Sequence, residues 1–246
     1  MITIPHKPTL TERVVDTSIK GLTGLLFRVD AKPLEQLPAY GPLIIVTNHV
    51  NFFEAPILYT RLQPRPLTGF AKIETWDSKF LGWLFDLWEM IPVRRGEADM
   101  KAVKQGIKAL KNGYIFTIAP EGTRSYTGEL GRGHPGVVMM AQLSGAPIVP
   151  LVHYGHENYK KEIPRLHRPK FNPIVGRKFW LDSGGEKVTG EIRQKMADEI
   201  MYQLAALLPP AYRGVYADLS QASEHYLTFP PGTTSNLRQV KEKIAR

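Results

Sequence analysis

The stretch Leu-Ile-Ile-Val-Thr-Asn-His-Val-Asn-Phe-Phe-Glu-Ala-Pro, residues 43–56, decides the fold class of this chain. Its opening apolar run predicts a β-strand over residues 43–47. A polar turn follows, and a helix is predicted from residue 54 to about residue 61. A strand, a polar turn and a helix in this order hold side chains at the mouth of a pocket.

His49 and Glu54 lie five residues apart across this turn. An imidazole can donate one ring N–H to a carboxylate and keep the other nitrogen free as a base. His49 is therefore a candidate general base and Glu54 its orienting group. A histidine and an acid at this spacing also arise by chance, so a histidine that only caps the helix is the structural alternative.

A second polar stretch, Ala-Pro-Glu-Gly-Thr-Arg-Ser at residues 119–125, follows the apolar run 115–118. Arg124 offers a planar fork of donors that suits a phosphate, and Gly122 allows the backbone to approach a ligand closely. The structural alternative is an ion pair between Glu121 and Arg124 that stabilises the loop. This stretch is a candidate phosphate-binding loop.

The two stretches together resemble the glycerophospholipid acyltransferases. In that family an N-H-x4-D block carries the catalytic His and Asp, and a P-E-G-T-R-S block binds the phosphate of the acceptor. Residues 91–95, Ile-Pro-Val-Arg-Arg, are similar to the G-x-I-F-V-x-R block of the family, with Glu89 in place of its Gly. Residues 147–151 resemble its proline-bearing strand. Glu54 stands where Asp is usual, which keeps the carboxylate and adds one methylene of reach.

The resemblance implies an O-acyltransferase that moves a fatty acyl group from acyl-CoA or acyl-carrier protein to the hydroxyl of a lysophospholipid. Lysophosphatidic acid, which gives phosphatidic acid, is the first choice of acceptor. His49 and Glu54 would be catalytic. The residues implied in substrate binding are Arg95, Glu121, Gly122, Thr123, Arg124 and Ser125.

No cofactor is expected beyond the acyl thioester, which is a co-substrate. The chain has no cysteine and no G-x-S-x-G elbow, so direct transfer without an acyl-enzyme is the simpler mechanism. Two alternatives stay open: a different lyso-lipid or glycolipid acceptor, or a catalytically dead module that binds lipid or nucleic acid through its basic surface.

The composition fits one α/β domain with a substantial core, because the chain has 246 residues of which 43% are hydrophobic. The absence of cysteine excludes disulfides and thiolate metal sites, and it fits a cytoplasmic location. His49 and Glu54 are not at the spacing of helical metal ligands, and His153 with His156 has no acidic companion motif. The sequence therefore predicts no metal site.

The net charge of +9 favours a polyanionic partner, either nucleic acid or an anionic membrane surface. No nucleic-acid-binding motif is present, so we expect the membrane surface and no nucleic acid. Residues 1–9 contain two prolines and lack the apolar core of a signal peptide. The uncharged stretch 137–154 is broken by glycine and prolines into a helix and a strand. We expect a cytoplasmic protein bound peripherally to the inner face of the membrane, of unknown oligomeric state.

Three helices have faces whose use the sequence leaves open. Apolar residues at helical spacing over 10–26 predict an amphipathic helix that packs on the core, the favoured alternative, or on lipid. A helix that starts after an N-cap at Asp77 and runs to residue 87 is rich in aromatics, which suit a packed core, an acyl-chain pocket or an interfacial anchor. The lysines of a helix at 99–112 form a solvated face or rest on anionic lipid.

Strands that alternate with helices predict an α/β fold with one layered domain, a largely parallel central sheet and flanking helices. We assign residues 1–246 to this single domain, with the core at 40–182, the N-terminal helix at 10–28 and the C-terminal helix and tail at 189–246. Residues 126–136 and 160–173 are expected to be loops. The further strands are predicted at 67–71, 90–93, 114–118, 148–153, 171–175 and 178–181, and the further helices at 136–144 and 189–208.

Overall fold

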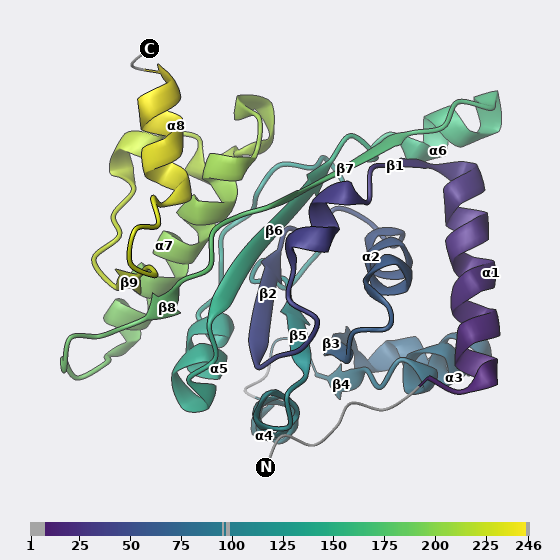
Figure 1. Ribbon diagram of the computed structural model, residues 1–246, viewed down its shortest axis with the longest axis horizontal. Helices are drawn as coiled ribbons and strands as arrows, with labels where there is room; N and C mark the ends of the chain where they lie inside the picture. Colours follow the sequence, from purple (N-terminus) through teal and green to yellow (C-terminus); the bar gives the residue numbers. More distant parts are fainter. Residues whose placement is uncertain (1–7, 95, 97–98, 245–246) are drawn as a thin grey trace.

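The central sheet of the protein is largely parallel, as the sequence predicts. The computed structural model describes residues 8–94, 96 and 99–244 (Figure 1). Within them, seven strands form one sheet in the order β1-β7-β6-β2-β5-β3-β4. The strands from β6 to β4 run parallel, while β7 is antiparallel to β6. The strands of this sheet are β1 (Arg28–Val29), β2 (Leu43–Thr47), β3 (Leu67–Lys72), β4 (Ile91–Val93), β5 (Ile115–Ile118), β6 (Ile148–Tyr154) and β7 (Lys170–Val175).

Helices cover both faces of the sheet, with α1 and α2 on one side and α5 and α7 on the other (Figure 1). A small antiparallel sheet of two strands, β8 (Trp180–Leu181) and β9 (Leu227–Thr228), lies beside α7 (Figure 1). The helices are α1 (Leu10–Leu26), α2 (Glu54–Leu62), α3 (Lys79–Leu87), α4 (Met100–Lys111), α5 (Gly136–Ser144), α6 (Tyr159–Glu162), α7 (Gly190–Leu207) and α8 (Asn236–Ile244). The short 3-10 turns are Lys32–Gln36, Ile73–Asp77, Ile163–Arg165, Pro210–Tyr212, Gly214–Tyr216 and Leu219–Gln221.

Strand β2 lies in the middle of the sheet and is buried on both faces. Successive side chains of a strand point to opposite faces, so Ile44 and Val46 join the apolar cluster with α5 and α7. Leu43 and Ile45 join the opposite cluster with Ile57 of α2. A strand that is covered on both sides needs apolar residues at every position, which explains the uninterrupted run in the sequence.

The carboxyl ends of the parallel strands meet at one edge of the sheet. Val46 of β2 pairs with Ile118 of β5, and Thr47 of β2 pairs with Leu151 of β6. The turn 48–53, the loop 119–135 and the segment that follows β6 therefore leave the sheet at the same edge. Ligand sites of open α/β sheets lie at such edges.

Three predicted boundaries were wrong. The aromatic helix begins after Ser78, whose hydroxyl accepts the N–H of Leu81, while Asp77 ends a preceding 3-10 turn. The amphipathic helix predicted over 10–26 is confirmed as α1, but the segment 10–28 assigned to the N-terminal helix extends too far, because Phe27 is already extended and the chain continues into β1. The segment 160–173, expected to be a loop, contains parts of α6 and β7 and the 3-10 turn between them.

Helices α1 and α3 pack against each other and leave apolar side chains on their outer faces. Val15 and Ile19 of α1 pack against a cluster that contains Leu84 of α3 and Trp88. The exposed apolar side chains of the two helices are Leu10, Val14, Leu22, Leu25, Phe80 and Trp83. Helix α1 thus docks on the core and also presents an apolar surface. Among the described residues, no helix combines the length and apolar character that crossing a bilayer requires.

Candidate active site

His49 and Glu54 are joined across the turn between β2 and α2. The ring Nδ1 of His49 donates a hydrogen bond to Oε1 of Glu54, which is the first residue of α2. The other carboxylate oxygen, Oε2, accepts the backbone N–H groups of Val50 and Asn51 at 2.9 and 2.8 Å. An ionised carboxylate only accepts hydrogen bonds, so Nδ1 of His49 carries the proton and Nε2 keeps its lone pair.

Glu54 is buried and nevertheless ionised. Its side chain is 5% exposed. Burial raises the pKa of this carboxyl, but the imidazoles of His156, His49 and His153 around it outweigh burial and hold the pKa well below its usual range. A permanent negative charge behind His49 stabilises the imidazolium that forms when His49 accepts a proton.

Glu121 ties the second motif to the first through the backbone. Its Oε1 accepts the N–H of His49 at 2.8 Å, and its Oε2 accepts the N–H of Gly131 at 2.8 Å. Burial raises the pKa of Glu121 to about 6, although these two N–H donors lower it. The backbone of Ser125 also donates to the carbonyl of His49 at 2.8 Å. Glu121 therefore positions the histidine turn, and these hydrogen bonds bring the two motifs together.

The other members of the second motif line or border the same site. Gly122 has φ 65, a left-handed conformation that favours glycine. Gly122 and Thr123 line the cavity next to His49. The Arg124 guanidinium lies 6.0 Å from the centre of the Phe52 ring. Within the described part of the chain Arg124 makes no ion pair, so the loop-stabilising pair with Glu121 is not formed.

The third predicted block reaches the site through Arg94. This residue follows β4, is exposed, and lines the cavity that contains His49. Arg95, the position matched to the arginine of the family block, lies outside the described residues. The sequence prediction for Arg95 is therefore neither confirmed nor excluded.

An apolar cavity opens beside the His49–Glu54 pair. Its volume is about 740 Å³, and its walls are mostly apolar. His49, Glu54 and Glu121 lie at its polar end, while Leu67 at the start of β3 belongs to its wall. Further wall residues are Leu58, Leu62, Phe85, Trp88, Met90 and Val103. The aromatic helix thus contributes Phe85 to the cavity, while its Phe80 and Trp83 face outward.

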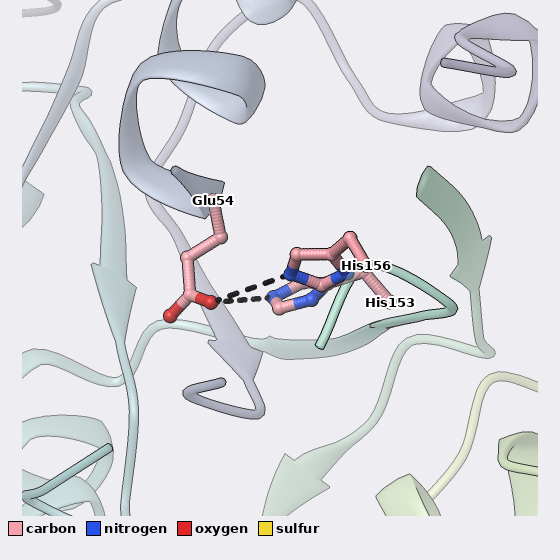
Figure 2. Close-up of side chains that lie close together, drawn as sticks. All are labelled: Glu54, His153 and His156. Atoms are coloured by element: carbon pink, nitrogen blue, oxygen red, sulfur yellow. Dashed lines mark ion pairs between the residues drawn. The ribbon is translucent and has the colours of Figure 1, made fainter. Parts of the chain in front are cut away.

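The sequence prediction missed the two histidines that lie behind Glu54. Figure 2 shows Glu54 with one carboxylate oxygen directed at the imidazoles of His153, the sixth residue of β6, and His156 in the turn after it. Oε2 of Glu54 lies 4.0 Å from Nε2 of His153 and 3.8 Å from Nε2 of His156. The prediction that these histidines lack an acidic companion was wrong, because Glu54 is that acid and is about a hundred residues away in the chain.

Two asparagines of the first motif hold the histidine segment in place. The side-chain amide of Asn48 donates to the carbonyl of His153 at 2.9 Å, and its oxygen accepts the N–H of the same residue at 3.0 Å. Asn51 donates to the carbonyl of His156 at 3.3 Å. Their place beside His49 in the sequence was the one signal that they serve the site.

Comparison with known proteins identifies the family. The acyltransferase family model matches residues 28–154, about half of the chain. The chain is 25% identical to 1-acyl-sn-glycerol-3-phosphate acyltransferase of Pseudomonas aeruginosa over 80% of this chain and 76% of that protein. It is 32% identical to the enzyme of the same name from Bacillus subtilis over 58% of this chain and 69% of that protein.

A solved structure supports the same fold. The crystal structure of the 1-acyl-sn-glycerophosphate acyltransferase from Thermotoga maritima superimposes with a TM-score of 0.53 at 21% identity, over 77% of this chain and 78% of that one. At this identity the likeness concerns the fold. Together with the family match and the curated relatives, it shows that the chain belongs to the acyltransferase family and is an O-acyltransferase.

Proposed function

We propose that this O-acyltransferase moves a fatty acyl group from acyl-CoA or acyl-carrier protein to the free hydroxyl of lysophosphatidic acid, giving phosphatidic acid. The single observation that carries the proposal is the His49–Glu54 pair at the polar end of an apolar cavity of about 740 Å³. A fatty chain bound along the apolar walls would present its thioester carbonyl next to His49. The names of the relatives from Pseudomonas aeruginosa and Bacillus subtilis support the choice of acceptor.

The chemistry follows from the free nitrogen of His49. The acceptor hydroxyl attacks the thioester carbonyl carbon while its proton passes to Nε2 of His49. The tetrahedral intermediate then collapses, the C–S bond breaks, and the departing thiolate takes the proton back from His49. The products are an ester and a free thiol, and the enzyme returns to its starting state. Glu54 stays ionised throughout and stabilises the transient imidazolium.

The acceptor phosphate would bind at the arginines around the cavity mouth. Arg124 makes no ion pair among the described residues, and Arg94 is exposed on the cavity wall. A charge-assisted hydrogen bond to phosphate suits either guanidinium. By the family pattern Arg95 is the third candidate. Glu121 is occupied with backbone N–H groups, so its part in binding is to hold the loop that carries Gly122 to Ser125.

Membrane attachment would bring the enzyme to its acceptor. The outer faces of α1 and α3 expose Leu10, Leu25, Phe80 and Trp83. Side chains of this kind enter the interfacial region of a bilayer, and the net charge of +9 adds attraction to anionic lipid. We propose peripheral binding to the inner, cytoplasmic face of the membrane. The exposed lysines of α4 would contribute to this attraction; they are Lys101, Lys104, Lys108 and Lys111.

A lyso-lipid without a phosphate is the alternative acceptor to lysophosphatidic acid. The chain is 29% identical, over 45% of its length, to a protein named lyso-ornithine lipid O-acyltransferase from Pseudomonas aeruginosa. An acceptor without a phosphate would leave Arg124 without a substrate partner. Acyl transfer from radiolabelled hexadecanoyl-CoA to a panel of lysophosphatidic acid, lysophosphatidylcholine and lyso-ornithine lipid decides between them. We expect lysophosphatidic acid to give the highest kcat/KM, and a preference for lyso-ornithine lipid would overturn the choice.

A further inference from the structure

His153 and His156 are buried imidazoles that the reaction chemistry does not use. Both are 0% exposed, and within the described part of the chain none of their four ring nitrogens has a hydrogen-bond partner. A buried polar group without a partner costs free energy, so such a pair calls for an explanation. One oxygen of Glu54, Oε2, lies 4.0 Å from Nε2 of His153 and 3.8 Å from Nε2 of His156 (Figure 2).

The orientation of the two rings is fixed by packing. Asn48 and Asn51 hold the backbone carbonyls of His153 and His156. The ring of His153 stacks on Phe171 of β7 with 5.0 Å between centroids and 19° between planes, and His156 lies 4.7 Å from the same ring. Their approach to Glu54 is therefore built into the core beneath the active site.

A divalent metal ion is one occupant that the group could hold, since its three ligand atoms lie within 4.8 Å of one another. The surroundings of Glu54 oppose it. Oε2 already accepts the N–H groups of Val50 and Asn51, and Oε1 accepts from His49. The group found among the described residues also lacks a fourth protein ligand.

We propose that His153 and His156 are positioning residues of the His49–Glu54 pair: as neutral rings that carry the proton on Nε2, they direct two N–H dipoles at Glu54 and set the proton affinity of the pair. The inference rests on the proposed function, because the task assigned to His153 and His156 is to tune the His49–Glu54 pair that would catalyse acyl transfer. Closing either Nε2–Oε2 gap to the upper limit of a hydrogen bond takes a movement of about 0.6 to 0.8 Å.

The charges around Glu54 show what these dipoles would do. Among the residues that the structure describes, four titratable groups face it: His49 on its own turn, Glu121 from the loop after β5, and the two histidines from the β6 side. Burial lowers the pKa of His153 to about 3, so this ring is uncharged at neutral pH. The positive ends of the two N–H dipoles stabilise the carboxylate and disfavour a positive charge on the nearby ring of His49. Removing them should make the pair take up a proton at higher pH.

Nitrogen-15 NMR of histidine-labelled wild-type protein tests the proposal without any substitution. We expect the resonances of His153 and His156 to report neutral rings with the proton on Nε2 at pH 7. A proton on Nδ1 in both rings, or imidazolium in both, would overturn the proposal. Because no substrate is present, this result does not depend on whether lysophosphatidic acid is the acceptor.

Variants add a kinetic test. His153→Phe and His156→Phe keep a ring against Phe171 and lose the donor, whereas His153→Gln keeps an N–H. We expect each Phe variant to lower kcat about three- to tenfold with unchanged donor KM, and to move the pH of half-maximal kcat up by about half to one unit. The Gln variant should lie close to wild type.

The matched control is Phe179→Leu, which removes a ring that is equally buried in the apolar cluster on the other face of the sheet and leaves the stack on Phe171 intact. It should lower stability and leave the pH of half-maximal kcat in place. An unchanged pH profile in folded His153→Phe and His156→Phe would contradict the proposal. So would stoichiometric zinc in purified wild-type protein that is absent from His153→Phe, because that outcome assigns the group to a metal. Failure of the proposed function would be recognised separately, as the absence of acyl transfer to lysophosphatidic acid in wild-type protein.

Discussion

Leu67→Phe should shorten the acyl chain that the enzyme prefers. Leu67 belongs to the cavity wall and pairs with Ile115 of β5, which pairs in turn with Leu43 at the start of β2. Strand β2 rises about 13 Å from this level to Thr47 at about 3.3 Å per residue, and His49 follows two residues later. Leu67 therefore lies at the end of the cavity that is remote from the dyad, where only the tail of a long chain would reach.

The size of the effect follows from the methylenes displaced. If the phenyl ring takes the place of about two methylenes of the acyl chain, a long donor loses about 0.8 kcal/mol for each, or about 1.6 kcal/mol in all. This corresponds to about fifteenfold in kcat/KM. A short donor does not reach Leu67 and should be used as before.

The assay compares kcat/KM for hexadecanoyl-CoA and decanoyl-CoA at saturating lysophosphatidic acid. Leu43→Phe is the matched control, because Leu43 lies at the same level of the sheet in the same apolar cluster but is absent from the cavity wall. Both substitutions overpack the core at a cost of about 1–3 kcal/mol. Only Leu67→Phe should change the ratio of the two donors. An equal ratio in both variants would show that the acyl chain lies elsewhere.

Three further predictions concern the acceptor, stability and the membrane. Arg124→Ala should raise the KM for lysophosphatidic acid about tenfold to a hundredfold and leave the donor KM unchanged, because a hydrogen bond to a charged group contributes about 1.5–3 kcal/mol; an equal rise in both would argue against a phosphate contact. The pKa of His153 is about 3 in the folded protein against 6.5 in the reference state. The stability that depends on an uncharged His153 is therefore fully present above pH 6.5 and is lost as the pH falls towards 3. Urea unfolding should show that wild type loses about 3 kcal/mol more than His153→Phe between pH 7 and pH 4, and parallel curves would refute this. Phe80→Ser with Trp83→Ser should weaken co-sedimentation with anionic vesicles at high salt, where charge attraction is screened, and unchanged binding would place the lipid contact on another surface.

The parts of the site that follow strand ends could be predicted from the sequence. The apolar run 43–46 and the run 115–118 predict strands, and parallel neighbours bring the residues after them to one edge. The proximity of His49 and Glu121 follows from this rule. Glu89, which stands where the family resemblance places a glycine, has φ 52 and so occupies a backbone conformation that favours glycine.

The parts that depend on packing between distant segments could not be predicted. Asn48 and Asn51 each bond to a residue 105 positions away, and no local pattern encodes such a pairing. For the same reason the sequence did not indicate that Glu54 lies beside His153 and His156. The antiparallel direction of β7 was not predicted either. Alternating strands and helices predict parallel neighbours, whereas the connection from β6 to β7 contains the short helix α6 and one 3-10 turn in place of a long crossover helix.

The measurement that tests the central claim most directly is the rate of acyl transfer from hexadecanoyl-CoA to lysophosphatidic acid in folded His49→Ala. Loss of a positioned general base should lower kcat by about a hundred- to ten-thousandfold. Glu54→Gln, which keeps the shape but loses the charge behind His49, should fall in the same direction with His49 intact. Circular dichroism and thermal unfolding would establish that both variants are folded. Wild-type activity in folded His49→Ala would contradict base catalysis by the His49–Glu54 pair.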